Sequence, residues 1–332
     1  MKAAVFKEAG LVAVEDVPAP KAGPGQVVVR ISYCGICGSD LHRYAHGLMA
    51  PGVIMGHEFA GVVTEVGERV REWSVGDRVV RGIKGRLQVA NPRYSARDKG
   101  FTVDVQAPGG YAEYTAQPAI GLLRQPENIT DEVAALAEPL AVAVHTVRLG
   151  NVKLGDTVVV MGAGPIGLFT LQCARLAGPG LLVVSEPSPA RREMARRLGA
   201  DVVLDPFAVD VVEEAVRLSG GLGPDVVFEC AGAKPTFQQA MEMARYRGQI
   251  VLVALCMDGC QISPLDWVGR EVQLQCSYGT EIPDWHVALS LLASGRVQGE
   301  PVISRVVPLA EIQAAFQALL QPTDDLQVLV RP

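Results

Sequence analysis

The segment from Thr157 to Leu176 constrains the fold more strongly than any other part of the sequence. It contains a short apolar run, a glycine-rich turn and an apolar stretch with helical spacing. The turn consists of Gly162, Ala163, Gly164, Pro165, Ile166 and Gly167. In such a turn the first glycine makes the bend, the second lets the backbone approach a pyrophosphate, and the third allows close packing of helix on strand. We therefore expect a dinucleotide to bind here, with its phosphates at the helix N-terminus.

Short apolar runs continue to alternate with helical stretches after this turn. The runs cover residues 157–161, 181–185, 202–204, 225–229, 249–255 and 272–276. Ser188 and Pro189 stand where an N-cap and a first-turn proline belong, and Gly199 stands at the end of the same helical stretch. The alternation predicts a parallel, doubly wound sheet with the full dinucleotide-binding set of strands.

A carboxylate after the second of these runs bears on which cofactor binds. Glu186 lies 19 residues after Gly167, where a carboxylate would bind the ribose hydroxyls of NAD and repel the 2′-phosphate of NADP. Arg191 and Arg192 follow, and they either form an exposed helix face or lie over the adenosine. We assign Arg191 and Cys230 to the cofactor site as well, and we expect NAD rather than NADP.

The first 130 residues have a different pattern. Val- and Ile-rich runs at 26–33, 59–66 and 76–80 are separated by Gly and Pro, which predicts a small, curled β domain. Beyond residue 278 we expect helices at 284–293 and 310–320 and strands at 302–307 and 326–330. The predicted organisation is α/β, with a catalytic domain at 1–140, a cofactor domain at 141–278, and a segment at 279–332 that returns to the first domain.

Charge and apolar patterning argue against several classes of protein. The formal net charge is −6, and Lys and Arg are scattered rather than gathered in a stripe, which argues against nucleic acid as a partner. The first residues contain no apolar region of signal-peptide length, and every apolar stretch is interrupted before it reaches membrane-spanning length. We therefore expect a cytoplasmic protein with no membrane partner.

The seven cysteines are too irregularly spaced to indicate a disulfide framework. Four of them have apolar neighbours and are expected to be small buried residues: Cys173, Cys230, Cys256 and Cys276. Cys34 and Cys37 form a C-x-x-C pair, but no thioredoxin-like strand and helix surround it, so a redox pair is disfavoured. Cys34 is expected to pack in the core.

Cys37 and His57 have the side chains of metal ligands. Cys37 follows an apolar run, and His57 lies twenty residues further along the chain. Zinc binds thiolate and imidazole ligands in a tetrahedron, and a catalytic zinc needs three protein ligands with one position left open. The spacing of the remaining Cys and His residues does not identify the third ligand.

Five strings occur in a specific order: CGSDLH at 37–42, GHEFAG at 56–61, GGYAEY at 109–114, EPLAVAVH at 138–145 and GAGPIG at 162–167. Over essentially the whole chain they resemble the zinc-containing medium-chain dehydrogenases, in the branch of sorbitol, butanediol and threonine dehydrogenases. The resemblance implies a GroES-like catalytic domain, a Rossmann cofactor domain, and hydride transfer from a secondary alcohol, diol or polyol to NAD. It also implies a homodimer or homotetramer that pairs through the sheet edge near residues 272–276.

The resemblance assigns metal-binding roles to individual residues. It implies that Cys37 and His57 are zinc ligands, and that Glu138 and Glu58 are carboxylates that bind the zinc or hold its water and exchange with each other. Asp40 would orient His57 through the second ring nitrogen.

Proton transfer is assigned in the same way. Ser39 and His42 would form the relay that carries the hydroxyl proton of the substrate to solvent, with Glu58 as a further catalytic group. His145 is expected to have a structural role in the helix that joins the domains.

The chain also departs from this family. Many relatives carry a structural zinc on four cysteines, and residues 82–110 contain no cysteine, so we expect one zinc per subunit. The basic stretch 84–99 is either a solvated or subunit-contacting loop, or a recognition loop for a phosphorylated or carboxylated substrate. Gln327 stands where some relatives place a basic residue for the pyrophosphate, which predicts weaker cofactor binding.

Several alternatives to polyol oxidation remain open. Within the branch they are L-threonine 3-dehydrogenase-like oxidation of an amino alcohol and oxidation of a sugar phosphate or sugar acid. A zinc-free quinone or enoyl reductase and a catalytically silent nucleotide-binding protein are more distant alternatives.

Overall fold

The computed structural model describes residues 1–82, 108–256 and 259–332. The chain forms two compact units. Unit 1 consists of Met1–Glu138 together with Ile303–Pro332, and unit 2 consists of Pro139–Val302. Helix α4 (Ala137–Gly150) begins in unit 1 and continues into unit 2.

Among its described residues, unit 1 is built on a seven-stranded sheet in which β14, β15, β3, β4, β5 and β7 are neighbours in that order, and β6 pairs with β3. A separate hairpin is formed by β1 and β2. The strands are β1 (Lys2–Glu8), β2 (Leu11–Asp16), β3 (Gln26–Gly35), β4 (Glu58–Val66), β5 (Arg78–Arg81), β6 (Tyr114–Pro118), β7 (Leu122–Arg124), β14 (Ile303–Pro308) and β15 (Gln327–Arg331). The register of β3 on β4 shifts at two places, and such irregularities bend and twist a sheet. The curled β domain expected from the first 130 residues is therefore confirmed.

Short helices accompany this sheet. They are α1 (Gly38–His46), α3 (Asp131–Ala135) and α11 (Ile312–Leu319), with 3₁₀ turns at Ala119–Gly121 and Leu309–Glu311. The core gathers alternate residues of β3 with apolar side chains from α1 and α11, among them Val27, Val29, Ile31, Tyr44 and Phe316. The ring of Tyr44 meets that of Phe316 edge to face at 5.1 Å between centroids, an arrangement that aromatic pairs favour.

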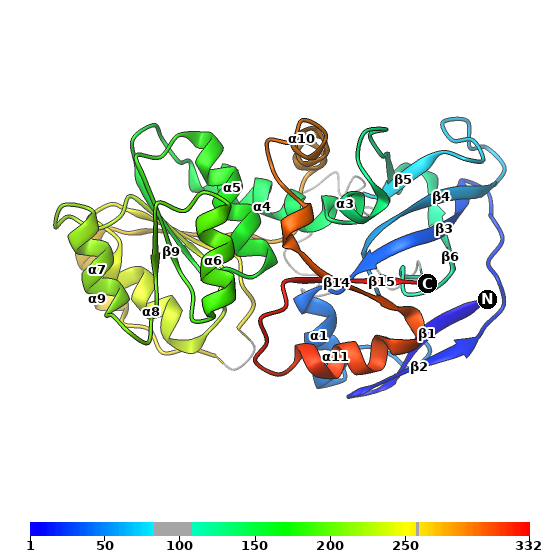
Figure 1. Cartoon of the computed structure of the whole chain (residues 1–332), viewed down its shortest axis with the longest axis horizontal. Helices are drawn as coiled ribbons and strands as arrows, with labels where there is room; N and C mark the ends of the chain where they lie inside the picture. The colour runs from blue at the N-terminus through cyan, green and yellow to red at the C-terminus, as the bar shows by residue number, and fades with distance from the viewer. Residues whose placement is uncertain (83–107, 257–258) are drawn as a thin grey trace. The chain divides into compact units, whose positions relative to one another are not determined.

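Unit 2 is a parallel six-stranded sheet in the order β10, β9, β8, β11, β12, β13, with helices between successive strands. The strands are β8 (Thr157–Met161), β9 (Leu181–Ser185), β10 (Val202–Leu204), β11 (Val226–Glu229), β12 (Gln249–Leu252) and β13 (Gln273–Cys276). The helices are α5 (Pro165–Ala177), α6 (Pro189–Arg197), α7 (Val211–Leu218), α8 (Lys234–Met243), α9 (Pro264–Arg270) and α10 (Ile282–Ala293), with a 3₁₀ turn at Glu300–Val302. The strand order reverses between β8 and β11, as in a dinucleotide-binding fold. Figure 1 shows strand β9 of this sheet with helices α5 and α6 beside it.

The last part of the chain divides between the two units. Helix α10 belongs to unit 2, where Asp284 is fully buried and forms ion pairs with His145 and Arg148 of α4. The residues from Ile303 onward belong to unit 1, where β15 pairs with β3. Of the expected returning segment 279–332, the structure therefore assigns 303–332 to unit 1 and 279–302 to unit 2.

All seven cysteines are free. Cys34 and Cys173 are buried, and Cys230 and Cys256 are partly buried. The prediction that Cys276 is buried was wrong, because Cys276 ends β13 at the edge of the unit 2 sheet, where all four residues of the strand are exposed.

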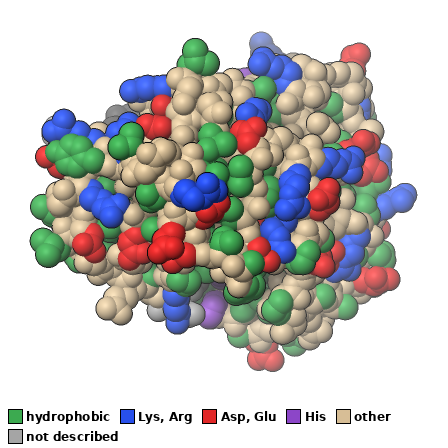
Figure 2. Space-filling model, turned by 60° about the vertical axis from the view of Figure 1, so that its left-hand side comes forward, with side chains coloured by type: hydrophobic (Ala, Val, Ile, Leu, Met, Phe, Trp, Pro, Cys, Tyr) green, Lys and Arg blue, Asp and Glu red, His purple; other side chains and the backbone are tan. Residues whose placement is uncertain are grey.

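Within the described ranges, no helix is both long enough and apolar enough to cross a membrane. On the face drawn in Figure 2, the Lys and Arg side chains are interspersed with Asp and Glu. This distribution agrees with the scattered charges of the sequence.

Candidate metal and nucleotide sites

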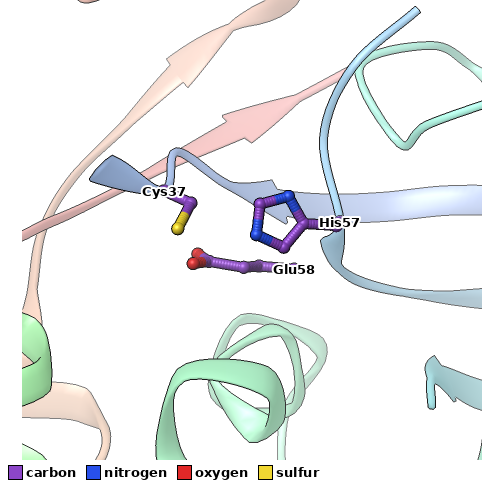
Figure 3. A group of neighbouring side chains, drawn as sticks. All are labelled: Cys37, His57 and Glu58. Carbon is purple, nitrogen blue, oxygen red and sulfur yellow. The ribbon is translucent and has the colours of Figure 1, made fainter. Parts of the chain in front are cut away.

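Cys37, His57 and Glu58 come together in unit 1. One potential ligand atom from each residue lies within 4.8 Å of the other two, and the three side chains point toward one another (Figure 3). Cys37 caps the N-terminus of α1 just after β3, and Glu58 begins β4. Because β3 and β4 are antiparallel with Gly35 opposite Glu58, the end of one strand meets the start of the other.

The sulfur of Cys37 accepts hydrogen bonds from its near neighbour in α1. The backbone N–H of Ser39 lies 3.4 Å from Sγ, and the Ser39 hydroxyl lies 3.3 Å from it. Arg43, one turn further along α1, donates from Nη1 to the same hydroxyl at 3.3 Å. These contacts hold the Cys37 side chain at the N-terminus of α1.

Asp40 lies behind His57. Its Oδ1 is 3.4 Å from His57 Nδ1, and its Oδ2 accepts a 2.7 Å hydrogen bond from the Tyr111 hydroxyl. Asp40 is 1% exposed, and Arg43 Nη1 is 3.4 Å from Oδ1. With Nδ1 turned toward Asp40, Nε2 is the ring nitrogen left for a metal, and carboxylates commonly orient metal-binding histidines in this way.

Sequence reasoning gave no role to Tyr111 or Arg43. Tyr111 lies within the GGYAEY string, and Arg43 follows CGSDLH directly. Both side chains are buried and contact Asp40. Tyr111 lies about 70 residues from Asp40 in the sequence. The sequence shows where these two strings occur, but it does not show which of their side chains are in contact.

The cluster buries several acidic groups. Burial and the nearby charge of Glu138 raise the pKa of Glu58 to about 8. Burial also raises the pKa values of Cys37 and Glu138. Burial by itself would lower the pKa of His57, but the charges of Asp40 and Cys37 hold it well above its usual range. A divalent cation among these buried groups would favour the ionised forms of Cys37, Glu58 and Glu138.

The donor types indicate which cation fits. A thiolate, an imidazole and a carboxylate form a mixed set that suits zinc, whereas magnesium and calcium take oxygen ligands. Glu138, in the first turn of α4, is not a member of the 4.8 Å group, although its charge acts on Glu58. The cluster therefore has the ligand chemistry of a zinc site, with Glu138 nearby as a further carboxylate.

The expected relay residues are only partly connected. Ser39 contacts Cys37, whereas no hydrogen bond between Ser39 and His42 is present among the described contacts. His42 is partly buried with its ring 6.4 Å from that of His46, and burial lowers the pKa of His42. A neutral imidazole is able to accept a proton, but a further group has to link it to Ser39.

The glycine-rich turn of unit 2 has the geometry that its three roles require. Gly162 has φ +90°, and a Cβ there would lie 3.0 Å from the Cα of Ala231. Gly164, the N-cap of α5, has open space around its missing Cβ. A Cβ at Gly167 would lie 1.9 Å from the carbonyl oxygen of Gly162, so only glycine lets α5 pack this closely. The turn thus leaves room for a phosphate group in front of the N-terminus of α5.

Glu186 is buried directly after β9. Its Oε2 accepts from the backbone N–H of Ala163 at 2.7 Å, and its Oε1 accepts from Ser188 N–H at 2.9 Å. Arg192 donates to the Glu186 carbonyl at 2.9 Å and forms an ion pair with Asp205 at 2.8 Å. The Arg192 side chain therefore binds other groups of unit 2 and does not form part of an exposed helix face.

The other two residues assigned to the cofactor site lie near this turn in different ways. Cys230 follows β11, and its Cβ would be 3.6 Å from a Cβ at Gly167. Burial raises the pKa of Cys230 far above the usual range, so its thiol stays protonated. Arg191 is partly buried in the first turn of α6.

Two features were expected to distinguish this chain from the family that it resembles. The basic stretch 84–99 lies outside the described residues. Gln327 is 2% exposed at the start of β15, and its amide contacts Glu58.

Two family models match the chain. The model of the alcohol dehydrogenase GroES-like domain matches residues 23–127, and that of the zinc-binding dehydrogenase matches residues 165–294. The (R,R)-butanediol dehydrogenase of Bacillus subtilis (strain 168) is 34% identical over 349 aligned residues, which cover all of both chains. The chain belongs to the zinc-binding dehydrogenases.

Other zinc-binding dehydrogenases are similarly related. The sorbitol dehydrogenase of Halalkalibacterium halodurans is 32% identical, with 100% of this chain and 99% of that protein covered. A zinc-binding dehydrogenase of Sinorhizobium meliloti 1021, solved bound to NADP, has a TM-score of 0.90 and 32% identity, with 100% and 99% of the two chains covered. The expected GroES-like and Rossmann folds are confirmed. Like the family, this dehydrogenase is an oxidoreductase that uses zinc and a nicotinamide cofactor on a small-molecule substrate.

Proposed function

We propose that this dehydrogenase oxidises a secondary alcohol, of the diol or polyol class, with NAD as the hydride acceptor. The observation that carries the proposal is the convergence of Cys37, His57 and Glu58 within 4.8 Å. The butanediol and sorbitol dehydrogenases that the chain resembles over its whole length support the substrate class. The metal-binding residues belong to the proposed catalytic domain at 1–140, and the cofactor-binding residues to the proposed domain at 141–278.

Cys37, His57 and Glu58 would hold the zinc, and Glu138 would exchange with Glu58 as a carboxylate ligand or bind the metal's water. When bound, zinc would supply Lewis-acid activation of the alcohol oxygen, and the nicotinamide would accept the hydride. Asp40 holds His57 in a single ring orientation, and Asp40 is itself held by Tyr111.

Proton removal is assigned to Ser39 and His42. The Ser39 hydroxyl lies 3.3 Å from Cys37 Sγ, close to where an alcohol would bind, and the lowered pKa of His42 favours its neutral, proton-accepting form. A proton would pass from substrate to Ser39 and reach His42 through a bridging hydroxyl group or water.

We assign NAD rather than NADP on the position of Glu186. A buried carboxylate hydrogen-bonded to the backbone of the glycine turn would repel a 2′-phosphate, and Arg192 is already paired with Asp205. The NADP-bound structural relative makes NADP the alternative that has to be tested. The ratio of kcat/KM for the two cofactors decides between them, and a ratio in favour of NADP would contradict this assignment.

We also propose one zinc per subunit, a homodimer or homotetramer, and a cytoplasmic location. Residues 82–110 contain no cysteine for a four-thiolate structural site. The exposed edge strand β13 supports pairing between subunits, and the seven free cysteines support a reducing compartment.

The test combines metal analysis with a substrate panel. The wild-type protein should contain about one zinc per chain, and Cys37→Ala and His57→Ala should lose both the zinc and NAD reduction. The panel contains sorbitol, 2,3-butanediol, threonine, and a sugar phosphate and sugar acid. Unchanged activity after complete zinc removal would contradict the proposed mechanism. Preference for threonine or for the charged sugars would identify one of the alternatives within the branch.

A further inference from the structure

Glu58 is tied to the last strand of unit 1. One of its carboxylate oxygens, Oε2, accepts a 2.8 Å hydrogen bond from Nε2 of Gln327. The same Nε2 donates to the carbonyl oxygen of Ile36 at 3.1 Å. Glu58 and Gln327 are each 2% exposed, so water does not compete for these bonds.

The order of the strands creates this contact. Strand β3 lies between β15 and β4, and Gly35 at its end is paired with Leu329 on one side and with Glu58 on the other. A Cβ on Gly35 would lie 2.2 Å from Glu58 Oε2 and 2.7 Å from Gln327 Nε2. The missing side chain of Gly35 is therefore what allows the two side chains to meet across β3.

The orientation of the Gln327 amide follows from its partners. The Ile36 carbonyl is only an acceptor, so the NH₂ end of the amide has to face it, and the same nitrogen bonds to Glu58 Oε2. Rotation of the amide would place its oxygen against the Ile36 carbonyl. Gln327 is thus held in one orientation, and it holds Glu58 in turn.

We propose that Gln327 is a positioning residue for the metal site, which by holding Oε2 of Glu58 fixes the carboxylate beside Cys37 and His57. The inference rests on the proposed zinc site and adds a residue to it that the metal would not touch. A glutamate side chain has several rotatable bonds, and fixing it before the metal binds removes part of the entropy loss of binding. Loss of such a supporting contact typically lowers metal affinity by about 10–100-fold.

The test uses Gln327→Met, which keeps the length of the side chain and removes both donors. The matched control is Gln117→Met: Gln117 is also 2% exposed in unit 1, and its Nε2 donates to Pro108 O and Thr115 Oγ, outside the metal cluster. The zinc dissociation constant of the metal-free protein is measured by competition with a chelator of known affinity. The ligand field is followed in the absorption spectrum after cobalt(II) substitution.

We expect Gln327→Met to weaken zinc binding by about 10–100-fold and to change the cobalt spectrum, while Gln117→Met stays within about twofold of wild type. A folded Gln327→Met with wild-type affinity and spectrum overturns the inference. If that variant does not fold, Gln327→Asn replaces it, because its shorter amide still fits the strand but does not reach Glu58. If the wild-type chain binds no zinc, or binds it equally well without Cys37, the proposed function fails instead.

Discussion

An added methyl group should change the stability of the protein differently at two glycines of the phosphate-binding turn. At Gly167 a Cβ would lie 1.9 Å from the carbonyl oxygen of Gly162, whereas at Gly164 it would meet no atom within 4 Å. Gly164 has φ −69° and ψ −177°, which alanine adopts without strain. The pair Gly164→Ala and Gly167→Ala therefore separates stability from cofactor binding.

The magnitudes follow from these distances. Real Cβ atoms do not approach within 3.0 Å, so Gly167→Ala has to displace the start of α5 from β8 by about 1 Å. Overpacking of this kind costs about 1–3 kcal/mol, and the displacement also moves the helix N-terminus away from the phosphates. Gly164→Ala should instead leave the stability of the free protein unchanged or raise it by about 0.4–1 kcal/mol, because alanine restricts the unfolded chain.

The assay is urea denaturation of the cofactor-free proteins together with NADH titration followed by fluorescence. Both variants should bind NADH at least about tenfold more weakly, since the methyl group at residue 164 occupies the space where the backbone approaches the pyrophosphate. Only Gly167→Ala should lose stability. Equal stability of the two variants, or wild-type NADH affinity in Gly164→Ala, would refute the assigned roles of the two glycines.

Three further predictions concern unit 2. Burial raises the pKa of Glu229, so the folded state keeps this proton to higher pH than the unfolded chain. The stability that this protonated carboxyl contributes is complete below the ordinary carboxyl pKa and is lost as the pH rises through the raised pKa. Glu229→Gln should reduce the resulting fall in melting temperature as the pH rises above the ordinary carboxyl pKa. Asp284→Ala removes the fully buried partner of His145 and should lower the free energy of unfolding by about 1–3 kcal/mol, measured in urea, whereas an unchanged value would mean that the pair is not formed in solution. Leu274→Asp, on the exposed edge strand β13, should raise the subunit dissociation constant at least about tenfold in sedimentation equilibrium, and an unchanged constant would place the interface elsewhere.

The strands of unit 2 were predictable because their pattern is local. The predicted bounds of β8, β9 and β10 match those observed, since each run is largely apolar and is followed directly by a Gly, Glu or Asp. Strand β12 ends earlier than predicted, at Leu252. Beyond it, the N–H groups of Val253 and Ala254 both bond to the carbonyl of Glu229, so the regular ladder stops although the residues remain apolar.

The parts that sequence did not predict depend on partners far along the chain. Cys276 has apolar neighbours, but whether its strand lies inside the sheet or at the edge depends on the order of all six strands. Gln327 was considered only as the replacement of a basic residue, and its contact with Glu58 joins positions 269 residues apart. The side-chain types of Cys37 and His57, which suit a metal, were readable from the sequence, whereas the groups that hold these side chains in place were not.

The position of β15 in unit 1 has a consequence for how the protein is made. A ribosome has to synthesise all of unit 2 before it reaches the strand that completes the unit 1 sheet beside β3. Glu58 is therefore made about 270 residues before its hydrogen-bond partner Gln327. Unit 2 is continuous in sequence and is available to fold while unit 1 still lacks its last strands. We expect the supported form of the metal site, and its full zinc affinity, to arise only after β15 has been synthesised.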